Sequence, residues 1–137
     1  DDDLVPSPSG IKGAGMGLFF RPSSPSSLLH EGEVLCYYCG HLHNFHSQKE
    51  LKDTSYLMLV DGDLFVDPGP LPQIKARYIN DPLNVRFVNC HLVAQAEELR
   101  CAIVASRDIR VGEELFFSYG DAYWDQRKFC GTIYGEQ

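Results

Sequence analysis

Short apolar runs, separated by Gly, Pro and Asp, restrict this chain to a narrow class of folds. A long amphipathic helix needs apolar residues three and four positions apart, and that spacing is scarce here. Short runs rich in β-branched and aromatic residues, bounded by turn-forming residues, are typical of strands. The sequence therefore predicts a mainly β fold. The expected strands are residues 17–20, 33–39, 56–60, 64–67, 84–88, 100–105 and 114–119.

Helical character is confined to two segments, residues 44–51 and residues 123–129. Residues 22–27 and 67–72 each contain several prolines, and we expect non-helical connectors there because a residue that precedes Pro disfavours helix. We expect residues 1–9 to be disordered. The remainder is expected to form one domain, since 137 residues are close to the usual domain size.

The charge of the chain indicates the kind of partner it binds. It carries 12 Lys and Arg against 19 Asp and Glu, a net charge of −7. An acidic surface repels a phosphate backbone, so we expect no direct nucleic-acid binding and a basic protein or peptide as the partner. No apolar run reaches the about 20 residues that a membrane span needs, so no membrane association is expected.

The five cysteines are odd in number and lack the spacing of a disulfide framework, which indicates free thiols in a reducing, intracellular compartment. They are Cys36, Cys39, Cys90, Cys101 and Cys130. An alternative is zinc, because Cys36 and Cys39 are followed by His41, His43 and His46. In the predicted strand 33–39, however, positions three apart face opposite sides, and no second Cys pair follows. Free thiols remain the first interpretation and zinc the second.

Four glycines, Gly10, Gly13, Gly15 and Gly17, precede an apolar strand. Glycine allows positive φ and lets a ligand approach the backbone closely. A dinucleotide-binding motif would need a helix after the glycines, whereas the next residues predict a strand. No Gly-Lys-Ser/Thr closes a phosphate-binding loop either. Taken alone, the pattern indicates a turn rather than a cofactor loop.

Three further motifs are each structural when taken singly. Residues 77–84 place two asparagines around an Asp-Pro turn, residues 105–115 join two strands through a polar turn, and residues 118–124 gather three aromatics. Glu113 and Glu114 in the second motif are expected to be solvated. Segments 32–40 and 112–120 share Gly, Glu, Leu and Gly at equivalent positions, and each predicts a turn that leads into a strand.

The order of these motifs is specific. A G-x-G turn precedes Gly-Glu-Val-Leu at 32–35, Arg-Tyr-Ile-Asn at 77–80, Arg-Asp-Ile at 107–109, Gly-Glu-Glu-Leu at 112–115 and Tyr-Gly at 119–120. This order resembles the SET domain, a family of protein lysine methyltransferases that use S-adenosylmethionine. The resemblance implies a SET domain over residues 10–124, with several small curved sheets around a C-terminal pseudoknot and few short helices. In that knot the C-terminal segment threads beneath a preceding loop, and the tail 125–137 would close the lysine channel.

The resemblance also implies which residues bind the cofactor. Backbone of Gly15, Met16 and Gly17 would contact its methionine end, Asn80 and the backbone of Asp81 would bind it, and Tyr123 or Trp124 would pack against adenine. Tyr119 matches the family's site tyrosine, with a catalytic and a cofactor-binding role. Tyr38 matches a second catalytic tyrosine that lines the lysine channel. No metal is implied.

The chemistry needs a neutral amine aligned with an activated methyl group, which is catalysis by orientation. Lysine has a pKa near about 10.4, and burial beside a positive sulfonium lowers that pKa. The Tyr119 hydroxyl would fix the amine or polarise the methyl group, and neither Glu113 nor Glu114 is needed as a base. Phe117 stands where the family has tyrosine or phenylalanine. Because phenylalanine leaves room for a methylated amine, we expect di- or trimethylation.

One departure from the family pattern keeps alternatives open. Asp81-Pro82-Leu83 stands where the family usually has His-Ser-Cys, and Pro82 removes one N–H from the turn. The chain is interpreted as a lysine methyltransferase of a basic, histone-like tail in the nucleus. The first alternative is a degenerate SET domain that binds a peptide without catalysis, and the second is a small zinc-binding interaction module. A flanking domain or partner, rather than the tail, is the other candidate for completing the site.

Overall fold

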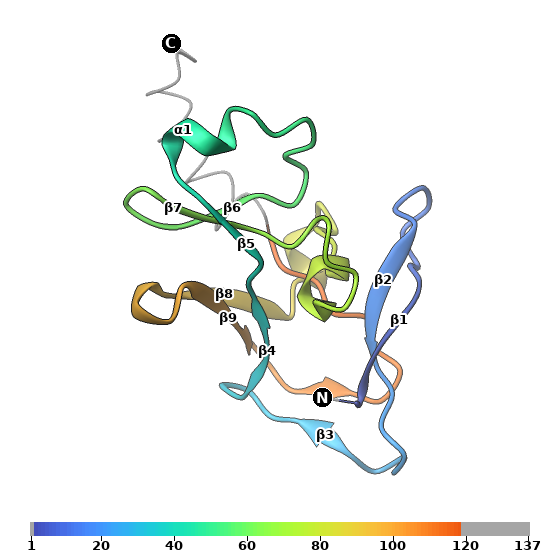
Figure 1. Cartoon of the computed structure of the whole chain (residues 1–137). Coiled ribbons are helices and arrows are strands. Elements are labelled where there is room, and N and C mark those ends of the chain that lie inside the picture. Colours follow the sequence, from blue (N-terminus) through green and yellow to red (C-terminus); the bar gives the residue numbers. More distant parts are fainter. Residues whose placement is uncertain (1, 119–137) are drawn as a thin grey trace.

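The structure, a computed structural model, describes residues 2–118, and these form a mainly β fold as the sequence predicted. Four small antiparallel sheets make up the described part (Figure 1). Two sheets have two strands each: β1 (Leu4–Pro8) pairs with β2 (Met16–Phe20), and β3 (Leu28–Leu29) pairs with β10 (Ile109–Arg110). In the third sheet, β9 (Arg100–Ala105) lies between β4 (Val34–Tyr38) and β8 (Cys90–Gln95). In the fourth, β7 (Leu64–Asp67) lies between β5 (His41–His43) and β6 (Met58–Asp61).

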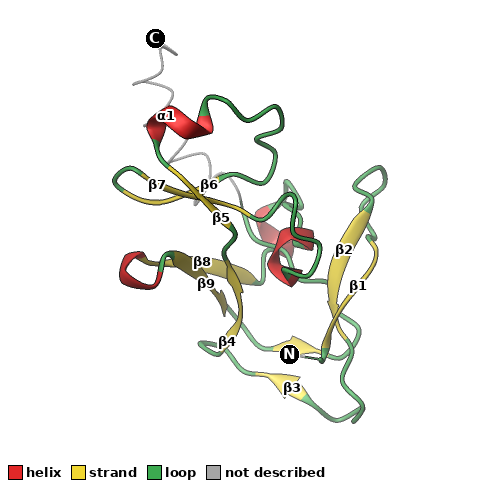
Figure 2. Ribbon diagram, in the orientation of Figure 1, coloured by secondary structure: helices red, strands yellow, loops and turns green. Residues whose placement is uncertain are grey.

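Helices in the described residues are short (Figure 2). They are α1 (Phe45–Gln48) and the 3₁₀ turns η1 (Lys75–Tyr78), η2 (Val85–Phe87) and η3 (Ala96–Glu98). The predicted helix 44–51 is therefore confirmed but shorter, with Asn44 and Ser47 forming a capping box at its start. No helix of the described residues is long and apolar enough to cross a membrane.

The N-terminal segment corrects the sequence prediction of disorder over residues 1–9. Leu4–Pro8 pairs along its length with β2, and Leu4 is only 3% exposed because it packs into the main core with Leu18 and Phe20. Pro6 and Pro8 lack an N–H donor, which weakened the strand pattern in the sequence. An edge strand tolerates this loss, because one side of its backbone has no partner strand.

Two predicted strands near the C-terminal end of the described residues are not formed. Residues 84–88 were predicted as a strand, but Val85–Phe87 is a 3₁₀ turn, and the N–H of Arg86 within it donates to the Asn84 side chain. Residues 114–118 contain two isolated bridges, Phe19 to Glu114 and Asn80 to Phe116, instead of a strand. The predicted helix 123–129 lies outside the described residues.

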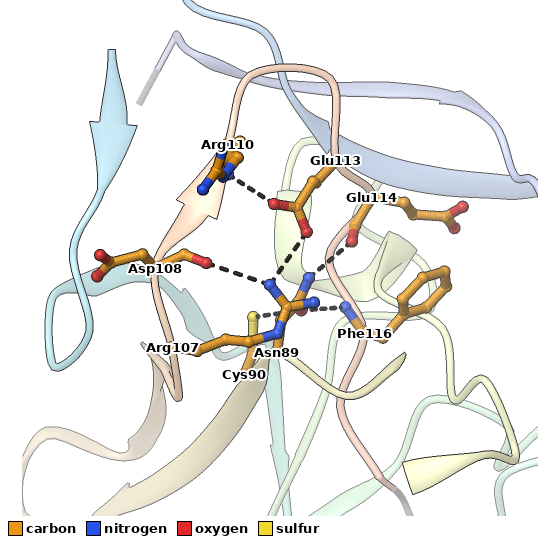
Figure 3. Close-up of polar contacts among 8 residues, drawn as sticks. All are labelled: Asn89, Cys90, Arg107, Asp108, Arg110, Glu113, Glu114 and Phe116. Atoms are coloured by element: carbon orange, nitrogen blue, oxygen red, sulfur yellow. Dashed lines mark hydrogen bonds and ion pairs between the residues drawn. The ribbon is translucent and has the colours of Figure 1, made fainter. Parts of the chain in front are cut away.

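The last described segment passes between two parts of a preceding loop. On one side Phe117 N donates to Asn80 O at 3.2 Å. On the other side Asn89 donates from Nδ2 to Glu114 O at 2.9 Å and accepts from Phe116 N at 2.8 Å (Figure 3). Loop 80–89 thus contacts this segment from both of its ends. These contacts lie where the resemblance implies the C-terminal pseudoknot, whose remaining segment lies outside the described residues.

Candidate cofactor and lysine site

The glycine turn and Asn80 meet, although they are far apart in the sequence. Asn80 Nδ2 donates to Met16 O at 2.9 Å across 64 positions of the chain. Gly15 has φ of +76°, a conformation that favours glycine, and its carbonyl accepts from Ser9 N at 2.8 Å. Met16 is 44% exposed, so this end of the turn lies at the surface next to Asn80. Four of the predicted cofactor residues, Gly15, Met16, Gly17 and Asn80, therefore lie together.

Glu114 lies behind this turn, and the sequence did not predict it there. It was expected to be solvated, yet it is 8% exposed. Its Oε2 accepts from Ser9 Oγ at 2.7 Å, and its Oε1 accepts from Gly10 N at 2.9 Å. A Cβ at Gly17 would overlap its carboxylate. No local signal could have found it, because the residues that cover the Glu114 carboxylate, Ser9, Gly10 and Asn80, are far away in the sequence.

Glu113, its neighbour, is more exposed and pairs with an arginine. It accepts from Arg110 N at 2.7 Å and pairs with Arg107 at 3.2 Å, and its side chain is 30% exposed. Figure 3 shows the Glu113 carboxylate directed toward Arg107 and Arg110, while the Glu114 carboxylate points away from them. The solvated character predicted for both glutamates is therefore correct only in part for Glu113, and wrong for Glu114.

The departure at residues 81–83 forms a local turn. Asp81 Oδ1 accepts from Leu83 N at 2.8 Å, and Leu83 adopts φ of +56° with 88% of its surface exposed. The Asp81 side chain therefore closes the turn, and the N–H that Pro82 lacks is not needed for it. Asn80, directly before the turn, keeps its bond to Met16.

The two described residues predicted for the lysine channel are in contact. Tyr38 and Phe117 lie edge to face, with ring centroids 6.4 Å apart and planes at 73°. Both are buried, Tyr38 at 4% and Phe117 at 1% exposure. The Tyr38 hydroxyl donates to Tyr56 O at 2.6 Å, which fixes the orientation of its ring.

Arg77 supports this pair from outside. Its guanidinium stacks on Tyr56 at 4.6 Å and on Tyr78 at 4.9 Å. It also donates to Pro68 O at 3.2 Å and Gly69 O at 2.8 Å. Planar stacking combined with two directed bonds needs arginine, which lysine does not replace. Arg77 thereby holds the residue whose carbonyl accepts from Tyr38.

Three of the predicted site residues, Tyr119, Tyr123 and Trp124, lie outside the described residues, as do the tail 125–137 and Cys130. The described part of the site consists of the glycine turn, Asn80, Asp81, Tyr38 and Phe117. The methyl-transferring end of the proposed site and its adenine contact remain sequence predictions.

The other four cysteines are free thiols. Burial raises the pKa of Cys36 and of Cys90 to about 12, and that of Cys101 to about 11, so these thiols stay protonated at neutral pH. Cys36 is buried in β4, whereas Cys39 follows the strand and is half-buried. Within residues 2–118 no three His, Cys, Asp or Glu side chains come together as metal ligands would.

Comparisons with known proteins identify the family and the fold. A sequence model of the SET-domain family matches residues 26–120. A solved structure titled a humanized mutant of the Polycomb Repressive Complex 2 of Chaetomium thermophilum, bound to the inhibitor GSK126, is similar with a TM-score of 0.66 and 28% identity. The match covers 87% of this chain and 15% of that chain.

The chain belongs to the SET-domain family, whose members are generally protein lysine methyltransferases. It spans only 15% of the length of the similar solved chain. The family and the mainly β, multi-sheet fold predicted from the sequence are thus confirmed.

Proposed function

We propose that this chain is an S-adenosylmethionine-dependent protein lysine N-methyltransferase that acts on a basic, histone-like tail in the nucleus. One observation carries the proposal above the others: the Asn80 amide donates to the Met16 carbonyl, so the glycine turn and the asparagine form one surface. That surface is joined to the Tyr38–Phe117 pair through the Asn80–Phe117 backbone bond. These contacts support a cofactor site beside the Tyr38–Phe117 pair, whose rings would flank the aliphatic stem of the substrate lysine.

The residues present fit the proposed cofactor. The position of a Cβ on Gly15 has no atom within 4 Å, so the turn is open on that side and backbone is accessible to a ligand. Backbone of residues 15–17, the Asn80 side chain and Asp81 would hold it, and Tyr123 or Trp124 would cover its adenine. When bound, the cofactor supplies a methyl group already activated by a positive sulfonium.

This chain's own residues would orient the lysine. The rings of Tyr38 and Phe117 would flank its apolar stem, and burial there would lower the pKa of the amine. The Tyr38 hydroxyl already donates to the Tyr56 carbonyl, so Tyr38 acts by shape and position rather than as an acid. We assign the hydroxyl that fixes the amine to Tyr119. Once the amine has lost its proton to water, its alignment accounts for the rate without a general base.

The acidic insert between residues 44 and 74 supports a basic substrate. A surface hollow of about 470 Å³ there is lined by Asp61 and Asp63, together with Leu42, His43, Asn44, Ser47 and Leu64. Asp63 accepts from Phe45 N at 2.6 Å, while Asp61 is exposed on the β6–β7 hairpin. The similarity to a chain of the Polycomb Repressive Complex 2 supports a nuclear setting and a partner or flanking domain that completes the site.

Transfer of a labelled methyl group from S-adenosylmethionine to histone-tail peptides tests the proposal. Asn80→Ala should lower the rate at least about a hundredfold, because the methyl donor loses its alignment. Asn84→Ala is the matched control, since that asparagine lies in the same loop but its side chain accepts from Arg86 N at 3.0 Å, within its own turn. Tyr119→Phe should also abolish transfer.

The degenerate SET domain remains the second candidate, favoured by the altered residues 81–83. Leu83, Val85 and Phe87 are exposed by 88%, 78% and 55%, an apolar loop beside Asn80 that suits protein contact. A wild-type chain that binds a basic peptide but transfers no label to any histone would establish this candidate and overturn the enzymatic proposal.

A further inference from the structure

We infer that Glu114 is a positioning residue of the cofactor site, whose buried carboxylate holds the glycine turn and Asn80 in one geometry. This inference rests on the proposed function and deepens it. Glu114 acts through its neighbours and takes no part in proton transfer, because both of its oxygens accept hydrogen bonds inside the protein.

The contacts of the carboxylate reach both halves of the site. Oε1 accepts from Gly10 N at 2.9 Å, and Oε2 accepts from Ser9 Oγ at 2.7 Å and, at a longer 3.5 Å, from Asn80 Nδ2. Asn80 Nδ2 also donates to Met16 O, so the amide connects Glu114 with the turn. Ser9 Oγ in turn accepts from Ile11 N at 3.0 Å. One carboxylate thus anchors the start of the turn and the side chain that meets its end.

The turn needs such an anchor. Between Ser9 and Gly17 it has four glycines, and glycine-rich backbone loses more conformational freedom on ordering than any other. Beyond the β1–β2 ladder, which ends at the Pro8–Met16 pair, Ser9 N donates to Gly15 O across the base of the turn, and Ala14 N donates to Ile11 O inside it. The carboxylate adds a constraint on the same turn from a distant part of the chain.

The space around Gly17 supports the same conclusion. A Cβ at Gly17 would overlap Glu114, and a Cβ at Gly10 would lie 3.6 Å from its Oε1. The carboxylate therefore packs directly under the turn. The three partners given above are neutral donors, and a buried carboxylate is costly unless such donors satisfy it. That requirement couples the position of the turn to the position of Glu114.

The test compares Glu114→Gln with Glu113→Gln, the same chemical change one residue away. The dissociation constants of S-adenosylmethionine and S-adenosylhomocysteine are measured by calorimetry on the full chain, with the folded fraction checked by circular dichroism. Glu114→Gln should weaken both about tenfold, because the Gln amide group cannot accept from every donor. Glu113→Gln should leave both within about twofold of wild type.

Kinetics and a milder pair of variants separate positioning from stability. In Glu114→Gln the KM for cofactor should rise while kcat at saturating cofactor changes little. Ser9→Ala, which removes one donor and spares the carboxylate, should weaken cofactor about threefold, and Ser9→Thr should restore it. This pair decides the matter if Glu114→Gln does not fold.

The outcomes are distinguishable. If wild type binds cofactor and Glu114→Gln binds it equally well per folded molecule, Glu114 is only a structural residue and the inference is wrong. Equal affinity of Ser9→Ala and Ser9→Thr overturns it as well. If the wild-type chain, tested with any flanking partner, does not bind cofactor at all, the proposed function fails and the inference falls with it.

Discussion

Tyr38 and Phe117 differ by one hydroxyl, and this hydroxyl distinguishes their roles in the proposed lysine site. The Tyr38 hydroxyl has a carbonyl partner in Tyr56, whereas Phe117 is 1% exposed and has no polar atom in its ring. Under the proposed function, the volume beside Phe117 decides how many methyl groups an amine can carry.

Phe117→Tyr tests product specificity. A hydroxyl at this buried position needs a hydrogen-bond partner and recruits a water or the amine itself, which leaves less room for a methylated lysine. We expect wild type to form di- or trimethyllysine and the variant to accumulate monomethyllysine, measured by mass spectrometry of the peptide. Phe116→Tyr, at a half-buried neighbour, is the control. A wild type that stops at monomethyllysine contradicts the prediction.

The buried thiols predict a pH effect of defined sign. Their folded pKa values of about 12 for Cys36 and Cys90 and about 11 for Cys101 lie above the ordinary value of 9.0. Above pH 9 the unfolded chain releases these protons before the folded chain does, so the free energy of unfolding should fall as pH rises towards 11.

Urea titrations at about pH 8, 9, 10 and 11, a range that spans the titration of thiols, measure the free energy of unfolding. In Cys36→Ala and Cys90→Ala this free energy should fall less steeply with pH. In the native state at the lowest of these pH values, iodoacetamide should label the half-buried Cys39 well before Cys36. Rapid native labelling of Cys36 would contradict the assignment.

At the scale of elements, the N-terminal hairpin shows where local patterns mislead. Strands 64–67 and 100–105 were predicted with the observed bounds. Each is a continuous run with strong β formers, and each is the central strand of a three-stranded sheet. β1 was missed because Pro6 and Pro8 weaken its pattern. Strand 84–88 was wrong because Asn84 caps a 3₁₀ turn instead.

Leu4→Ala tests the role of β1. Leu4 is 3% exposed and packs in the main core, so its truncation should cost about 2–4 kcal/mol of unfolding free energy, measured in urea. Val5→Ala, on the other face of the strand and half-buried, should cost less than about 1.5 kcal/mol. Equal losses in the two variants would mean that β1 does not anchor the hairpin that leads into the glycine turn.

At the scale of the whole molecule, the net charge of −7 becomes an expectation about substrate. If the acidic residues attract a Lys- and Arg-rich tail, the KM for that peptide should rise with ionic strength, because salt screens exposed charges beyond about 8 Å at physiological ionic strength. Initial rates between low and moderate salt measure this, with the KM for cofactor as the internal reference.

Asp61→Asn locates the effect. Removal of this exposed charge from the hollow should raise the peptide KM about twofold to fivefold and reduce its dependence on salt. Glu97→Gln, the same loss of one charge in the η3 turn, is the control and should change little. A peptide KM that does not respond to salt would show that the net negative charge does not contribute to peptide binding.

The sequence by itself determined the class of fold and the residue types of the site. Alternation and turn residues are local properties, so the mainly β character could be predicted, and the order of motifs identified the SET family with Gly15, Met16, Gly17, Asn80 and Asp81 as cofactor candidates. Only the tertiary structure decided what lies behind them. Glu114 becomes buried because an N-terminal hairpin 104 positions away covers its face. Residues that distant meet through packing and threading, which no local pattern encodes.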